Sequence, residues 1–350
     1  MTAASSFQTQ TISGTQTIAG IPISGRRVPA LDAFDRTIAE FMQQRNLKAL
    51  TLAISRGDRV IFSRGYGYGD PQLRTVVSPN ALMRVASVDK PVTNAAIEQL
   101  VRQGRLSHTT KVFPLLGITS VADPRFNDIT VKHLQDHKWW EGVHHYPHHN
   151  LVDVARLLGV SSPPSTLDIA RYIARRPLQY APGTRGDYCG FCYDLLREVV
   201  EKISGKSIVE YLRTDLGMFD VAQAQAIPQK RHPQEIWYIS PGYCRNLYSP
   251  RSRDPVPCAD GGFPVWRTTF ITSSPALADF LNRYWISGHP RPSGSTGAVY
   301  AFFGGWPGTY AMVSQRPDGI NMAVLSNGGD GYDNLKDILD RVADRIQQWP

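Results

Sequence analysis

Ser87 and Lys90 stand three residues apart in a largely apolar run from Arg84 to Ile97. Residues three apart on a helix share one face, so the lysine amine can reach the serine hydroxyl. A serine hydroxyl becomes a strong nucleophile only when a base takes its proton, and a lysine can do so when its pKa is depressed. Free N–H groups at a helix N-terminus would also stabilise negative charge beside Ser87. The spacing therefore predicts a catalytic serine at the start of a helix.

The same Ser-x-x-Lys pattern also allows a purely structural interpretation, because four-residue patterns arise by chance. In that interpretation Ser87 caps the helix, Lys90 is a solvated residue of the first turn, and Pro91 marks the helix start. Pro91 also disfavours helical geometry at Lys90, which shifts the expected start by a few residues. Further motifs must decide between the two interpretations.

Several further motifs follow one another along the chain in a definite order. They are residues 66–69 (Tyr-Gly-Tyr-Gly), 86–93 around Ser87, 129–134 with His137, 180–183 (Tyr-Ala-Pro-Gly) leading to Tyr188, 261–262 with 272–280, 304–308 (Gly-Gly-Trp-Pro-Gly) and 324–327. In order and spacing the chain resembles the serine β-lactamase and penicillin-recognising family, especially its class C branch with D-aminopeptidases, family VIII esterases and related acyltransferases. The resemblance implies an α+β fold of the β-lactamase/transpeptidase type. An antiparallel sheet flanked by the N- and C-terminal helices then adjoins an all-helical lobe, with the active site between them.

Tyr188 is the second catalytic candidate, because the resemblance implies that a tyrosine here shares proton transfer with Lys90. A phenol ordinarily titrates at about pH 10, so it can act as a base only if nearby cations favour the phenolate. Alternatively, Tyr188 lines the pocket without proton chemistry. Gly190 stands where the family's Tyr-x-Asn motif has asparagine, so the amide that would hold a substrate carbonyl is missing.

The resemblance aligns Phe302, Phe303 and Gly304 with the family's Lys-Thr-Gly or His-x-Gly strand motif. It also implies an oxyanion hole formed by the backbone N–H groups of Ser87 and Gly305. The motif's cation, which in the family helps to hold a substrate carboxylate, is absent from this chain. Its loss argues against β-lactams and D-peptides as preferred substrates and favours a neutral, apolar acyl group.

The segment 137–142, which holds one histidine and two tryptophans, replaces the family's His-Thr-Ser-Gly motif. We expect His137, Trp139, Trp140 and the more distant Trp306 to line the substrate pocket with residues 302–304; the alternative is that each tryptophan belongs to the core. The histidines of residues 133–149 also suggest a metal site. However, Pro147 interrupts the helix that a four-residue spacing would need, and no acidic partner pattern stands out. We therefore expect no metal and no other cofactor.

The composition is that of an ordinary globular protein, with 350 residues, 42% hydrophobic and 19% charged, and a formal net charge of +8. The basic residues are scattered, which argues against nucleic-acid binding. Four cysteines are too few for a disulfide scaffold. Cys189 and Cys192 have redox-motif spacing but do not follow a strand in a thioredoxin-like unit, so reduced thiols are expected. Cys244 and Cys258 do not form the second close pair of a four-cysteine zinc site.

The first 28 residues are rich in Ser, Thr, Gln and Gly, and they lack a basic region followed by an apolar stretch. We expect no signal peptide and no membrane span, and by default a cytoplasmic location. The segment is expected to be a flexible arm or an edge segment.

The hydrophobic pattern predicts the elements that position these residues. It predicts a helix over 29–45, a β-hairpin over 50–62, and mostly helices from 80 to about 225, including 131–137, 151–158, 167–174 and 191–203. Strands over 298–303, 310–315 and 320–327, with turns at 304–305 and 316–319, precede a last helix over 335–346. One catalytic domain over 29–350 results, with an α/β lobe of about 29–79 and 258–350 and a helical lobe of about 80–257, after the flexible arm 1–28.

These residues predict a serine acyl hydrolase of the esterase, thioesterase or amidase type, which forms an acyl-enzyme at Ser87 with a neutral, apolar acyl substrate. One alternative is an acyltransferase or cyclase of small-molecule (natural product) biosynthesis. Another is a catalytically silent β-lactamase-like binding protein, which the missing asparagine and cation would favour. The expected partner is a small-molecule acyl substrate, with neither nucleic acid nor a membrane, and a homo-oligomer stays open.

Overall fold

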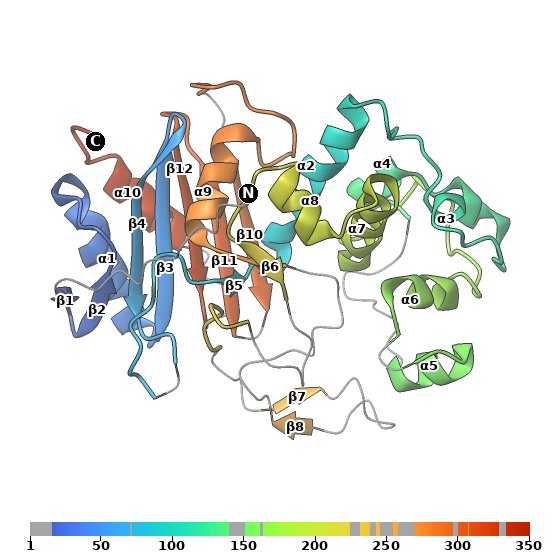
Figure 1. The fold of residues 1–350 in the computed structure, drawn as a ribbon, viewed down its shortest axis with the longest axis horizontal. Helices are drawn as coiled ribbons and strands as arrows, with labels where there is room; N and C mark the ends of the chain where they lie inside the picture. The colour runs from blue at the N-terminus through green and yellow to red at the C-terminus, as the bar shows by residue number, and fades with distance from the viewer. Residues whose placement is uncertain are drawn as a thin grey trace, which may run out of the picture.

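The fold is built on a seven-stranded antiparallel sheet with strand order β1-β2-β4-β3-β12-β11-β10 (Figure 1). The structure is a computed structural model that describes residues 16–70, 72–139, 151–161, 164–224, 232–238, 243–245, 255–257, 270–296, 300–306, 308–328 and 334–350. Strands from the two ends of the chain meet where β3 (Ala49–Arg56) pairs with β12 (Ile320–Ser326). The remaining strands are β1 (Gln16–Ile18), β2 (Ile21–Ser24), β4 (Arg59–Gly67), β10 (Tyr300–Trp306) and β11 (Thr309–Gln315).

Three helices cover the two faces of this sheet. α1 (Asp32–Gln44) and α10 (Leu335–Ala343) pack on one face, and α9 (Ser274–Arg283) packs on the other (Figure 1). Side chains of a strand alternate between faces, so the large residues of β3 meet the terminal helices while its alanines lie under α9. The expected flanking of one antiparallel sheet by helices from both chain ends is confirmed, and both terminal helices lie on the same face.

The helical lobe lies beside the sheet and carries α2 (Asp89–Arg102), α3 (Val112–Leu115), α4 (Val131–Gln135), α5 (Leu151–Leu158), α6 (Thr166–Ile173), α7 (Gly190–Ser204) and α8 (Ile208–Thr214) (Figure 1). Short 3₁₀ segments precede α1 and α2 and follow α3: η1 (Pro29–Leu31), η2 (Ala86–Val88) and η3 (Pro124–Asp128). No helix among the described residues is both long enough and apolar enough to cross a membrane.

The expectation of an all-helical lobe over 80–257 is too simple, because short strands occur there as well. Within this range, β5 (Met83–Arg84) and β6 (Val221–Gln223) form a three-stranded sheet with β9 (Phe270–Thr272), which follows the range, and β7 (Tyr243–Arg245) pairs with β8 (Pro255–Pro257). Strands of two or three residues are too short for an alternating pattern to reveal them.

The N-terminal segment differs from the flexible arm expected over 1–28. Residues 16–24 form the hairpin β1–β2 at the edge of the main sheet, where Ile23 of β2 pairs with Tyr66 of β4. The Ile23 side chain is buried beside α1, so burial of apolar surface holds this polar-rich segment in place. Residues 1–15 lie outside the described residues.

The turn expected at Gly304 and Gly305 is wrong, because both residues lie inside strand β10. They pair with Ala311 and Tyr310 of β11, and the connection between the strands comes after Trp306. A Cβ on Gly304 would lie 2.8 Å from the Ser87 backbone nitrogen. The glycine is needed for this close approach between the sheet and the helical lobe, rather than for a turn.

Candidate active site

Ser87 lies in the 3₁₀ segment η2, directly before the first turn of α2, and it is half-buried. The helix that follows buries an apolar stripe that includes Val92, Ala96 and Leu100, which anchors this end in the core. Ala86 adopts a positive φ of 44°, a conformation that residues with a Cβ rarely take. Strain of this kind persists only where the surroundings hold it, and here strand β10 packs against the segment through Gly304.

Tyr188 reaches Ser87 from the segment that precedes α7, and its hydroxyl lies 2.5 Å from the Ser87 Oγ. The Gly183 N–H donates to the Lys138 carbonyl at 2.7 Å, which ties this segment to the residues after α4. A Cβ on Gly186 would lie 1.7 Å from the His137 carbonyl oxygen, so only glycine fits there. The loop is thereby fixed in the position that brings Tyr188 to Ser87.

Lys90 is buried beside the tyrosine rather than bonded to the serine. Its Nζ lies 4.9 Å from the ring centroid of Tyr188 and 5.3 Å from that of Tyr193, and 3.5 Å from Asp89 Oδ1. No hydrogen bond joins Lys90 to Ser87 in the described part of the chain. The direct reach of the amine expected from the Ser-x-x-Lys spacing is therefore not seen, and the tyrosine makes the contact with the serine hydroxyl.

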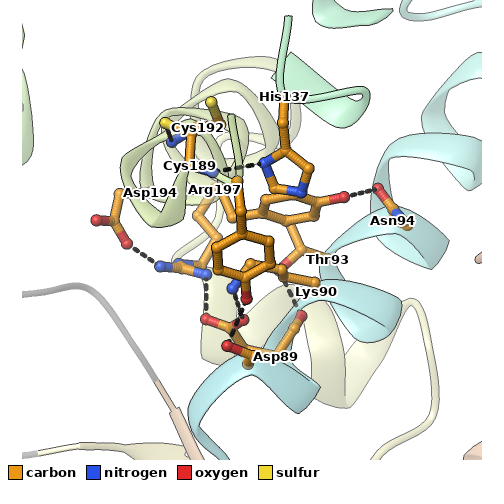
Figure 2. Close-up of polar contacts among 12 residues, drawn as sticks. Asp89, Lys90, Thr93, Asn94, His137, Cys189, Cys192, Asp194 and Arg197 are labelled. Atoms are coloured by element: carbon orange, nitrogen blue, oxygen red, sulfur yellow. Dashed lines mark hydrogen bonds and ion pairs between the residues drawn. The ribbon is translucent and has the colours of Figure 1, made fainter. Parts of the chain in front are cut away.

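A buried ion-pair network lies beneath Lys90 (Figure 2). Arg197 of α7 donates to Asp89 Oδ2 at 2.8 Å and also to Asp194, one turn before it on the same helix. Asp89 therefore lies between two cations, Arg197 and Lys90. Buried charges are tolerated when they are paired in this way, and the pairing fixes the geometry of the groups around Lys90.

The imidazole ring of His137, labelled in Figure 2, lies against the rings of Tyr188 and Tyr193. Its ring centroid lies 4.9 Å from that of Tyr188 and 5.3 Å from that of Tyr193, and its Nδ1 accepts the Cys189 N–H at 3.0 Å. Burial, reinforced by the positive charge of Lys90, lowers the pKa of His137 to about 4. The imidazole is therefore neutral near pH 7, with its proton on Nε2.

We expect NMR to show that the His137 imidazole titrates with a midpoint of about 4 instead of its ordinary 6.5. The pKa of His137 is lower in the folded chain than in the unfolded chain, so as the pH falls the unfolded chain binds the proton before the folded chain does. Stability that is present above pH 6.5 is therefore lost as the pH falls towards 4. The resonance can be assigned by its loss in His137→Gln, and urea unfolding at pH 7 and pH 5 measures the stability. A midpoint near the ordinary value would contradict the burial argument.

The glycine-containing strand lies against the serine from the sheet side. Gly304 packs on the backbone of η2, and a Cβ on Gly305 would meet nothing within 4 Å, so the space beside its backbone is open. Phe302 is half-buried and packs against the core cluster that contains Val85 and Val88. Phe303 is 42% exposed. Successive strand residues point to opposite faces, so these two phenylalanines have different surroundings.

The expected role of Trp139 in a substrate pocket is not supported by its position. The side chain is 1% exposed, its ring lies against Phe113 and Phe126, and its Nε1–H donates to Cys192 Sγ at 2.7 Å. Trp139 is therefore part of the core of the helical lobe, which was the alternative left open for the tryptophans. Trp140 and the side chain of Trp306 lie outside the described residues.

Cys189 and Cys192 are buried free thiols at the start of α7, where Cys189 Sγ accepts the Cys192 N–H at 3.1 Å. Cys258 and the side chain of Cys244 lie outside the described residues. Among the side chains that the structure describes, no group of three or more His, Cys, Asp or Glu is arranged to hold a metal ion. Residues 144–149 fall outside that set, so the expectation of no metal stays a prediction for them.

Sequence reasoning missed three residues of this site: Asp89, Tyr193 and Arg197. Asp89 directly precedes Lys90, while Tyr193 and Arg197 stand four residues apart on one face of α7. The Tyr193 hydroxyl donates to Asn94 Oδ1 at 3.2 Å, so this tyrosine is held away from the serine. The sequence carried a signal for two of them. Asp89 and Arg197 are charged residues at positions that the apolar patterns of α2 and α7 place in the protein interior.

An antiparallel sheet with helices on both faces, joined to a helical lobe that presents a serine at the start of a helix, defines a β-lactamase/transpeptidase-like fold. The family model named Beta-lactamase matches residues 34–243, more than half of the chain, and the chain belongs to this family. The resemblance and the fold class expected from the sequence are both confirmed.

Solved structures similar to this chain carry the same fold. The β-lactamase/D-alanine carboxypeptidase from Pseudomonas syringae has a TM-score of 0.65 and 16% identity, covering 91% of this chain and 100% of that chain. A class C β-lactamase has a TM-score of 0.65 and 14% identity, covering 92% and 97% of the two chains. At these identities the likeness concerns the fold alone.

Two curated relatives match over shorter segments. Esterase EstB from Burkholderia gladioli is 26% identical over 210 residues, which cover 56% of this chain and 52% of that protein. Protein flp from Staphylococcus aureus (strain N315) is 23% identical over 193 residues, which cover 51% of this chain and 34% of that protein. The matched region thus spans about half the length of the first relative and about a third of the second.

Proposed function

We propose that this protein is a serine acyl hydrolase in which Ser87 forms an acyl-enzyme with a neutral, apolar acyl group. The observation that carries the proposal is the 2.5 Å contact between the Tyr188 hydroxyl and the Ser87 Oγ. A nucleophile and its base must lie within hydrogen-bond reach, and this pair does. Lys90 beside the tyrosine ring and the esterase name of one relative support the same assignment.

In the proposed reaction, Tyr188 as a phenolate accepts the Ser87 proton while the serine oxygen attacks the acyl carbonyl. The phenol then returns this proton to the leaving group as the acyl–oxygen, acyl–sulfur or acyl–nitrogen bond breaks. In the second half of the reaction, water attacks the acyl carbonyl and gives one proton to the Tyr188 phenolate. Tyr188 then passes this proton to the Ser87 oxygen as the acyl–serine bond breaks and the acid is released. Lys90, 4.9 Å from the ring centroid, supplies a positive charge opposite the phenolate throughout.

The backbone N–H groups of Ser87 and Gly305 are proposed as the oxyanion hole. Gly304 holds β10 against the backbone of η2, and Gly305 follows it on the same strand beside open space. Loss of one such donor typically lowers the rate by about a hundredfold or more. Because the donors come from the helical lobe and from the sheet, we propose that residues 29–350 act as one catalytic domain with the site between its lobes.

We expect neutral p-nitrophenyl esters to be hydrolysed faster than matched esters that carry a carboxylate on the acyl group. Phe302 lies on the core cluster beside η2, where an apolar ring covers apolar surface and gives a substrate anion no partner. Phe302→Lys should shift the ratio of the kcat/KM values towards the anionic ester by about tenfold or more, the effect of one charge-assisted hydrogen bond.

Tyr300→Lys is the matched control for this test, because Tyr300 is an exposed aromatic residue at the start of the same strand and is not among the residues expected in the pocket. The control should leave the ratio unchanged. Faster turnover of the anionic ester by the unmodified protein, or efficient hydrolysis of a β-lactam reporter, would remove the claim of a neutral acyl substrate. Equal effects of the two lysines would show a general charge effect and not a role of position 302.

A further inference from the structure

The hairpins β3–β4 and β11–β12 turn at the same end of the sheet, and a cavity lies there. It has a volume of about 230 Å³, and its walls include Arg56 and Gly57 from the first hairpin, Asp318 and Gly319 from the second, and Asn282 and Arg291 from α9 and the loop after it. We call it the hairpin-end cavity. None of the residues that line it belongs to the candidate active site.

Arg291 is a buried cation in the wall of this cavity, with 8% of its surface exposed. Its Nη1 donates to the Leu281 carbonyl at 2.9 Å and to Asn321 Oδ1 at 2.5 Å, and its Nη2 donates to the Ser295 carbonyl at 2.6 Å. All three acceptors are neutral. A guanidinium has five N–H donors, so two remain without a protein acceptor among the described residues.

The charge of Arg291 is also unmatched in the described part of the chain, where no carboxylate forms an ion pair with it. Burial lowers the pKa of this guanidinium from its ordinary value, with no opposing contribution from an anion. Asp318, the carboxylate in the cavity wall, is already bound by Arg316 at 2.9 Å and accepts the Ile320 N–H at 3.1 Å. The Trp285 ring lies 4.5 Å from the guanidinium carbon and offsets part of the cost of burying this charge, but a ring does not accept the two free N–H groups, and an anion would.

Asn282, another residue of the same wall, carries an unsatisfied donor as well, but protein atoms cover this donor and the cavity does not reach it. Its side chain is buried, with 7% exposed, and its Nδ2 has no hydrogen-bond partner. The orientation of the amide follows from its neighbours. Arg291 can only donate, so Asn321 turns its Oδ1 to Arg291 and its Nδ2 to Asn282 Oδ1 at 2.9 Å. The network therefore leaves the Asn282 Nδ2 without an acceptor.

We propose that the hairpin-end cavity binds a small oxyanion, a carboxylate or phosphate group, through Arg291. A guanidinium with two free donors matches the two oxygen atoms that either group presents. Arg56 adds an exposed positive charge at the cavity wall. A volume of about 230 Å³ lies below the range of typical drug-sized sites and suits an ion or a small metabolite.

The test is a melting experiment on the full chain with inorganic phosphate, malonate or chloride at constant ionic strength. A ligand that binds only the folded state raises the Tm, so phosphate or malonate should raise it and chloride should not. The anion with the larger shift identifies phosphate or carboxylate as the preferred group. Arg59→Ala is the control variant, because Arg59 pairs with Arg56 in the same hairpin without lining the cavity, and its response should equal that of the unmodified protein.

Asn282→Asp is the decisive variant, because it places a carboxylate in the side-chain network that reaches Arg291 through Asn321, and it keeps the Oδ1 that Ser55 and Asn321 use. It should melt at a higher temperature than the unmodified protein without added anion, and calorimetry should show at least a tenfold loss of affinity for the anion that binds. Arg291→Gln should lose the anion response if it folds. An unmodified protein whose Tm is the same in all three salts, or an Asn282→Asp variant that responds as the unmodified protein does, would overturn the proposal.

Discussion

Replacing Ser87 with alanine is expected to lower kcat/KM for an activated neutral ester by about a million-fold, the loss seen when a serine hydrolase loses its nucleophile. Tyr188 contacts the serine oxygen at 2.5 Å. Without this oxygen there is no nucleophile for Tyr188 to deprotonate. Any remaining activity would come from substrate binding and oxyanion stabilisation alone.

The covalent step can be measured separately by mass spectrometry with a fluorophosphonate. One phosphonyl group should appear on the peptide that contains Ser87, and it should be absent from Ser87→Ala. Ser107→Ala, an exposed serine beyond the end of α2, is the control and should be labelled as fully as the unmodified protein. A protein that takes up no label at all would be the catalytically silent binding protein. Label on another residue, with turnover intact in Ser87→Ala, would refute the nucleophile.

Tyr188→Phe is expected to lower kcat by about a hundred- to ten-thousandfold, with a much smaller change in KM, because general-base assistance acts in the transition state. The substitution removes one oxygen atom and leaves the ring that faces Lys90 and His137. Steady-state kinetics on a neutral ester measures both constants.

The chain offers a closely matched control in Tyr193→Phe. Both tyrosine rings lie beside Lys90 and against His137, at centroid distances that differ by 0.4 Å in each case. Only the Tyr188 hydroxyl contacts Ser87, whereas the Tyr193 hydroxyl donates to Asn94. Tyr193→Phe should therefore keep most of the turnover. Similar losses in the two variants would show that the hydroxyls act through packing, and Tyr188 would then be a pocket wall.

Much of the fold follows from the sequence because its long elements carry clear periods. The helix over 29–45 appears as η1 and α1, the hairpin over 50–62 as β3 and β4, and the expected helix over 191–203 as α7. The predictions of secondary structure fail where the local pattern carries no information. Gly304 and Gly305 look like a turn in any short window, and only the approach of Ser87, far away in the chain, explains why they form part of a strand.

The candidate site shows the same division between local and distant information. Spacing places Ser87 and Lys90 together, and the order of motifs adds Tyr188, which lies next to the serine in the structure. The position of Trp139 depends on which helices pack around it, and a sequence window does not contain that information. The partnership of Asp89 with Arg197 likewise joins two helices that are more than a hundred residues apart in the chain.

The pairing of β3 with β12 also bears on how the chain folds during synthesis. Contacts between residues so distant in sequence form late, because the long intervening loop must first close. The ribosome releases Ser87, Lys90 and Tyr188 long before Gly304, so a nascent chain can assemble the serine–tyrosine pair in the helical lobe while the sheet is unfinished. Until β12 arrives, β3 presents an open strand edge that can pair with other copies. Aggregation during translation, rather than poor chemistry, is thus the failure expected of chains truncated before β10.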